Sequence, residues 1–132
     1  MGRSSGSAGA TRYVVASYRW NAVNLALSSA FFVADRAYTV RGIRGRVDAL
    51  GVDIGTVTAV VRKVPSGTAI ASGTVLHTGS FNLKGTDDSN QTLALSSTPS
   101  DLAIVAGDAL AVHLTGVPTS GQGCVSVTLE PS

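Results

Sequence analysis

The sequence has little cysteine and few charged residues. Cys124 is the single cysteine among 132 residues, which excludes an internal disulfide and any metal site built from several cysteines. It lies at the start of an alternating apolar run, so we predict that it is a small core residue. Charged residues make up 14% of the chain, against about 25% in typical soluble domains. Such a surface is typical either of a compact β domain rich in small residues or of a protein covered by a partner.

The chain also lacks a long apolar run. No stretch approaches the roughly 18 residues that a membrane-spanning helix needs. No apolar segment precedes a cleavage site near the N-terminus, so we expect no signal peptide and no membrane partner. Synthesis and folding in a host cytoplasm follow as the expectation. A chain of 132 residues is long enough for one domain with its own core.

Residue patterns that carry catalysis are absent as well. There is no Gly-x-Ser-x-Gly motif for a hydrolase nucleophile, and His77, His113 and Cys124 are too few and too scattered for a zinc site. We predict that both histidines point outward from strands. The loop Asp87-Asp88-Ser89-Asn90 offers oxygen ligands to calcium, but it lacks the spacing of an EF-hand loop, and acidic turn residues need no metal. Few aromatic residues are available to line a glycosidase cleft. We therefore predict no enzyme, no catalytic residue, no metal and no cofactor.

Short segments of alternating apolar and polar residues dominate the chain from residue 38 onward. The first carries Ile43, Val47 and Ala49 on one face and Arg44, Arg46 and Asp48 on the other. A period of two is typical of a half-buried strand, and no stretch keeps a period of 3.6. We predict an all-β antiparallel sandwich, a jelly roll of about eight strands. Short strands are expected at 68–71 and 74–78, with Phe81 and Leu83 facing the core.

The N-terminal part differs from the rest. Residues 1–11 are small and polar, so they cannot bury enough apolar surface to order themselves. Residues 12–27 contain the only tryptophan and two of the three tyrosines. We predict an extended N-terminal arm over 1–27 and the sandwich over 28–132. Since Tyr, Trp and Arg are enriched at interface hot spots, the candidate partner-binding residues are Arg12, Tyr13, Tyr18, Arg19 and Trp20. The alternative is an ordinary first strand whose aromatic side chains close one end of the core.

Charge is divided unevenly along the chain. Residues 1–46 hold seven arginines and one aspartate, whereas residues 47–132 hold three basic and seven acidic residues. A basic leading segment can dock on an acidic protein surface, on nucleic acid or on a sister subunit. The arginines form no dense run and lysine is scarce, which disfavours nucleic acid. The low charge and the predicted exposure of Ala109 and Ala111 favour a homo-oligomer.

Several strand-and-turn phrases resemble small β-rich structural proteins of tailed bacteriophages, in particular capsid decoration (cement) proteins. The phrases are 57–67, 68–73, 81–86, 90–95 and Leu102-Ala-Ile-Val-Ala-Gly-Asp-Ala-Leu110. The resemblance implies a jelly-roll protomer, often a trimer, seated on the outer face of the capsid. Its partner would be the major capsid protein, its location the virion, and its action the stabilisation of the shell by protein–protein contacts. Removing residues 1–20 is then expected to abolish capsid binding and to leave the sandwich folded.

A second class of function stays open, a ligand-binding β-sandwich such as a carbohydrate-binding module or a receptor-binding domain of a phage fibre. Sugar binding by stacking requires exposed aromatic side chains. After residue 38 the only aromatic residue is Phe81, which we place inside. This counts against sugar binding.

Overall fold

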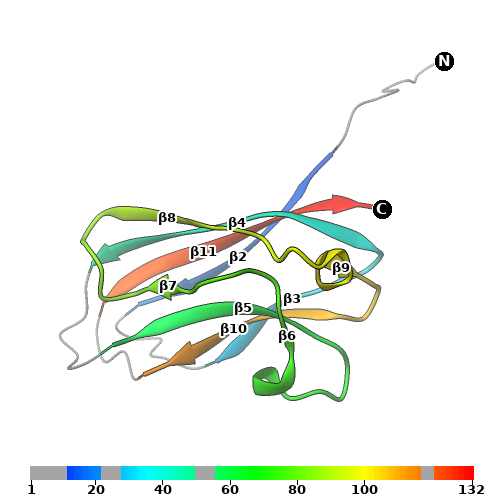
Figure 1. The fold of residues 1–132 in the computed structure, drawn as a ribbon, viewed down its shortest axis with the longest axis horizontal. Coiled ribbons are helices and arrows are strands. Elements are labelled where there is room, and N and C mark those ends of the chain that lie inside the picture. The colour runs from blue at the N-terminus through cyan, green and yellow to red at the C-terminus, as the bar shows by residue number, and fades with distance from the viewer. Residues whose placement is uncertain (1–11, 22–27, 50–55, 117–120) are drawn as a thin grey trace.

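The structure is a computed structural model, and it describes residues 12–21, 28–49, 56–116 and 121–132. Its strands form two antiparallel sheets that pack face to face (Figure 1). The elements are β2 (Val14–Trp20), β3 (Ser29–Val33), β4 (Tyr38–Ala49), β5 (Thr58–Val64), η1 (Ile70–Ser72), β6 (Thr74–Val75), β7 (Phe81–Asn82), β8 (Ser89–Leu93), η2 (Pro99–Leu102), β9 (Ala103–Ile104), β10 (Ala109–Thr115) and β11 (Gln122–Pro131). The predicted all-β antiparallel sandwich is confirmed.

Each sheet is built around two long central strands. One sheet has the order β2-β11-β4-β8, with β9 also on β4, and the other has the order β3-β10-β5-β6, with β7 also on β5. We call them the β4 sheet and the β5 sheet. Ten strands are described, two more than about eight as predicted, and three of them, β6, β7 and β9, have only two residues. The helical elements of the described residues are two short 3-10 helices, η1 and η2. Neither is long enough to cross a membrane.

The core lies between the sheets and follows the alternation of the sequence. Ile43, Val125 and Leu110 are fully buried and come from both sheets, while Phe81 and Leu83 point inward as predicted. Each fully buried large apolar side chain contributes about 1.5–3 kcal/mol to stability. The edge strands β2 and β3 meet at one side of the sandwich, where the rings of Tyr18 and Phe31 lie 6.0 Å apart.

The N-terminal segment departs from the prediction of an arm. Val14–Trp20 pairs with β11 along its whole length, so this stretch is an ordinary edge strand of the β4 sheet. Tyr18 and Trp20 are only 8% and 6% exposed and belong to the core. The alternation of buried and exposed residues along β2 explains this, since Ala16 and the two aromatic residues share one face. Residues 1–11 and 22–27 of the predicted arm lie outside the described residues.

His77 is buried, with 5% of its surface exposed, so the prediction that it points outward is wrong. It lies where β5 passes from pairing with β6 to pairing with β7. At this break the Val61 N–H donates to His77 Nε2 at 2.9 Å, and Leu76 N–H donates to the Val61 carbonyl at 3.1 Å. The imidazole thus takes the place of a backbone acceptor, because a buried N–H must find a partner. Burial lowers the pKa of His77 below its usual value.

A 3-10 turn replaces the strand predicted at 68–71. η1 packs on the outer side of β10 and β5. Ala111 on β10 is fully buried, so the predicted exposure of that residue is wrong. Gly73 makes the close approach possible, because a Cβ there would lie 2.8 Å from the Lys63 carbonyl oxygen.

Candidate docking face

The outer face of the β4 sheet carries most of the candidate binding residues. We define the arginine face as the outward side chains of its four main strands: Val15, Ser17, Arg19, Arg44, Arg46, Asn90, Thr92, Cys124, Ser126 and Thr128. The register aligns them in rows across the sheet. One row reads Arg19, Cys124, Arg46 and Asn90, and the next reads Ser17, Ser126, Arg44 and Thr92.

Small side chains form the floor of this face. The hydroxyls of Ser17 and Ser126 lie 3.4 Å apart across β2 and β11. Cys124 is half-buried and lies on this outer side, so the prediction of a core cysteine is wrong. Its inward neighbours on β11 are Gly123 and Val125. Between Arg44 and Arg46 of β4, the face has a hollow of about 280 Å³, also lined by Asn90, Thr92, Cys124 and Ser126.

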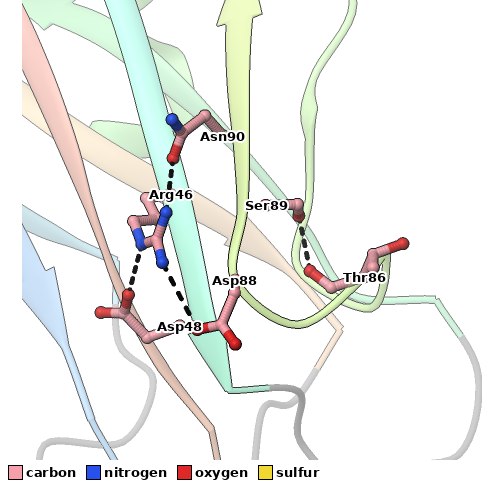
Figure 2. A network of polar contacts seen from close by, with 6 residues as sticks. All are labelled: Arg46, Asp48, Thr86, Asp88, Ser89 and Asn90. Carbon is pink, nitrogen blue, oxygen red and sulfur yellow. Dashed lines mark hydrogen bonds and ion pairs between the residues drawn. The ribbon is translucent and has the colours of Figure 1, made fainter.

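Arg46 is held by three acceptors on the β4 and β8 side of the hollow (Figure 2). Its Nε donates to Asp48 Oδ1 at 2.7 Å, and its Nη1 donates to Asn90 Oδ1 at 3.0 Å. Its Nη2 forms a longer contact of 3.4 Å with Asp88. The hydrogen bond to Asp48 raises the pKa of the Arg46 guanidinium. The charge of this arginine is therefore balanced within the chain.

The loop that offered ligands to calcium supplies two of these acceptors. Asp88 adopts a left-handed backbone conformation with φ of 56°, and the Ser89 hydroxyl donates to the Thr86 carbonyl, as Figure 2 shows. Both Asp88 and Asn90 turn an oxygen toward Arg46. In the described ranges no three His, Cys, Asp or Glu side chains gather as metal ligands.

Arg44 differs from its neighbour two residues away. Its side chain is exposed, and its guanidinium lies over Gly42, where a Cβ would be 3.4 Å from Nη2. No acceptor in the described part of the chain pairs with it. An arginine presents five N–H donors in a fork that fits a carboxylate. Arg44 is thus the cation of this face that is available to a partner.

The five residues predicted to bind a partner do not form one patch. Arg19 belongs to the arginine face, and Arg12 and Tyr13 are exposed just ahead of β2. Tyr18 and Trp20 point to the other side of the strand into the core, and burial raises the pKa of the Tyr18 hydroxyl. Composition alone selected all five, and it missed Arg44, which the alternation along residues 43–49 placed on the polar face of its strand.

Comparison with known proteins identifies the fold and no family. No protein-family model matches the sequence, and no curated protein does so either. A solved chain described as "Cyanophage Pam1 capsid asymmetric unit" matches over 92% of this chain and 85% of its own, with 15% identity and a TM-score of 0.56. A chain of infectious bursal disease virus, Gx strain, matches over 90% of this chain and 32% of its own, with 12% identity. Its TM-score of 0.37 is too low to carry an argument. The chain therefore shares its fold with a phage capsid chain of similar length.

Proposed function

We propose that this protein is a non-enzymatic virion structural protein, a decoration or cement protein that binds the outer surface of a phage capsid and stabilises it. The observation that carries the proposal is the fold match to the Pam1 capsid chain, which spans nearly the full length of both chains. A match of whole chains of similar length supports a subunit that acts as a single sandwich. The strand-and-turn phrases that resemble decoration proteins point the same way.

The proposed action is adhesive. A subunit that binds the assembled shell, and not its separate parts, stabilises the shell by linkage. Many copies arranged with the symmetry of the shell multiply modest contacts through avidity. The major capsid protein is the proposed partner, and a trimer is the proposed state of the protein.

The predicted partner-binding residues enter this proposal in two groups. Arg12, Tyr13 and Arg19 supply contacts, because all three are exposed at or beside β2. Tyr18 and Trp20 hold β2 on the core and so fix the position of Arg19. The segment ahead of Val14 takes the role of the extended arm.

The first test is the copy number of this protein in purified particles of the virus whose genome encodes it. Quantitative mass spectrometry against the major capsid protein measures it. A decoration protein is expected at a simple symmetric fraction of the capsid subunits. A handful of copies per particle would instead indicate a tail or fibre protein, and absence from the particles contradicts the proposal.

A truncation that tests the N-terminal segment must leave β2 in place. Removing residues 1–20 would delete β2 and part of the core, so the earlier expectation that the sandwich survives this truncation no longer holds. Removing residues 1–13 keeps β2 intact. This variant is expected to fold with unchanged cooperativity and to bind particles more weakly than the full chain, as measured by co-sedimentation.

A further inference from the structure

The charge on Arg44 has no counter-charge among the described residues. The described acidic side chains already accept hydrogen bonds or ion pairs within the chain. They are paired as follows: Asp35 with Tyr38, Asp48 and Asp88 with Arg46, Asp101 with Ser96, Asp108 with the Val105 N–H, and Glu130 with Arg41. Asp87 also has an interaction of its own. Within the described residues Arg44 is thus left without an acidic partner, so a carboxylate of another molecule can pair with it.

The surroundings of Arg44 fit a carboxylate. The hollow between Arg44 and Arg46 is about 280 Å³ and is lined by Ser126 and Thr92, whose hydroxyls can donate hydrogen bonds. Asn90 turns its oxygen to Arg46 and its amide nitrogen away (Figure 2), which leaves that nitrogen as another donor. A carboxylate bound here would receive charge-assisted hydrogen bonds, which are shorter and stronger than neutral ones.

The geometry points to a docking site on the arginine face for an acidic surface of another protein, with a glutamate or aspartate side chain of that partner seated between Arg44 and Arg46. This deepens the proposed function, on which it rests for the identity of the partner. The flat floor of serine, cysteine and threonine side chains lets a partner backbone approach the sheet closely. Arg46, held in place by its own acceptors, is a fixed wall of the site, and Arg44 supplies the charge.

A protein fits this face better than a nucleic acid. A protein surface that binds nucleic acid neutralises several successive phosphates with basic side chains. Here the carboxylates of Asp48 and Asp88 flank Arg46 and would repel a run of phosphates. None of the side chains that define the arginine face is aromatic, so bases have nothing there to stack on. One carboxylate, in contrast, requires only one available cation.

The test uses the full chain and one matched control. The variants are Arg44→Gln, Arg44→Glu and, as the control for the same charge change elsewhere, Arg36→Glu on the exposed turn before β4. Each variant is first checked by urea unfolding. Binding to particles stripped of the protein is measured by co-sedimentation, and binding to poly-L-glutamate and to single-stranded DNA is measured by fluorescence titration. Cys124 lies in the hollow and serves as a reporter, since its alkylation by iodoacetamide slows when a partner covers it.

The expected loss of affinity for particles and for poly-L-glutamate is about tenfold for Arg44→Gln and about a hundredfold for Arg44→Glu. Arg36→Glu is expected to change either affinity less than about twofold, because exposed charges outside an interface contribute little. Bound particles are expected to slow alkylation of Cys124 in the wild type and not in Arg44→Glu.

The outcomes separate the two proposals. If the wild type binds particles while Arg44→Glu binds equally well and Cys124 stays reactive, docking through this face is wrong and the proposed function stands. If the wild type is absent from particles, the proposed function fails. The site is then tested by poly-L-glutamate alone, and binding that does not weaken in the Arg44 variants contradicts it. Tighter, Arg44-dependent binding of DNA than of poly-L-glutamate would overturn a protein partner. Loss of self-association in Arg44→Glu without loss of particle binding would also overturn it, in favour of a second copy of the chain.

Discussion

The two sheets of the sandwich differ in what lies on their outer faces. On the β5 sheet, η1 contacts the strands β10 and β5, and Arg62 is bound within the chain, with Nε donating to His113 Nδ1 and Nη1 to the Gly73 carbonyl. On the β4 sheet, no such segment covers the outer face in the described ranges, and Arg44 has no acceptor of its own there. Arg62 is thus used within the fold on one face, whereas Arg44 on the other has no acceptor among the described residues. This difference favours the arginine face over the outer face of the β5 sheet as the proposed docking surface.

The sharpest way to break this comparison is a pair of glycine substitutions. In Gly73→Ala the new Cβ would lie 2.8 Å from the Lys63 carbonyl oxygen and 2.9 Å from Val64 Cγ2, so η1 would have to lift from the sheet. We expect a loss of about 2–3 kcal/mol in the free energy of unfolding. The measurement is urea denaturation followed by the fluorescence of the single tryptophan.

Gly42→Ala is the control on the arginine face. There the nearest atom to the new Cβ is Arg44 Nη2 at 3.4 Å, the far end of a flexible side chain. We expect a change within about 0.5 kcal/mol. Equal losses for the two variants would show that the outer faces are packed alike and would remove the basis of the comparison.

His77, whose side chain accepts a hydrogen bond from β5, gives the next largest effect. His77→Leu replaces the imidazole with an apolar side chain of similar size and leaves the buried Val61 N–H without its acceptor. An unsatisfied buried donor costs about 1–3 kcal/mol, and we expect a loss of about 2 kcal/mol by urea denaturation at pH 7.5.

The same residue makes stability depend on pH. Because burial lowers the pKa of His77 below its usual 6.5, the unfolded chain binds this proton more readily than the folded one. The contribution of neutral His77 to the stability of the folded protein is complete above pH 6.5. It is lost as the pH falls through the pKa of His77 in the folded protein. Unfolding measured from pH 7.5 to 5 should show this slope in the wild type and in His113→Gln, and a flatter one in His77→Leu. An unchanged slope in His77→Leu would assign it to other groups.

A third pair compares one outward-facing arginine from each sheet. Arg62→Gln removes the hydrogen bond to His113 on β10 and the one to the Gly73 carbonyl at the end of η1, and we expect it to cost about 1 kcal/mol. Arg44→Gln is expected to change stability by less than about 0.5 kcal/mol. Thermal unfolding of both variants side by side measures this. A larger loss in Arg44→Gln than in Arg62→Gln would mean that Arg44 serves the fold.

Much of this arrangement could be predicted from the sequence because alternation alone determines which side of a strand faces the core. The period of two placed Phe81 and Leu83 inside, and Arg44 and Arg46 on the opposite side from Ile43, as the structure has them. The predictions were wrong where the burial of a residue depends on an element other than its own strand and that strand's partner. Nothing in β10 itself indicates that Ala111 is buried on the outer side, and nothing near His77 reveals the break in the pairing of β5.

The candidate site was predictable only in part. Composition favoured the aromatic residues near the N-terminus, yet alternation along β2 turns Tyr18 and Trp20 inward and leaves Arg19 outside. The availability of Arg44 depends on which acidic residues the fold brings to Arg46, and Asp88 and Asn90 reach it from β8 and the loop before it. Such pairing between distant strands is set by register, which the sequence does not display.

The smallest effect tests the placement of Cys124. On the arginine face its replacement by serine exposes the new hydroxyl to water, so we expect Cys124→Ser to change the free energy of unfolding by less than about 0.5 kcal/mol. The neighbouring Val125 is fully buried, and Val125→Thr, which places a hydroxyl inside, is expected to cost about 1–3 kcal/mol. The native protein should also react with a small thiol reagent before it unfolds, because the cysteine is half-exposed. If the cysteine reacts only in urea and Cys124→Ser loses much stability, the side chains of β11 face the opposite way, with Cys124 in the core. The arginines paired with it would then face the core, and the difference between the two outer faces would disappear.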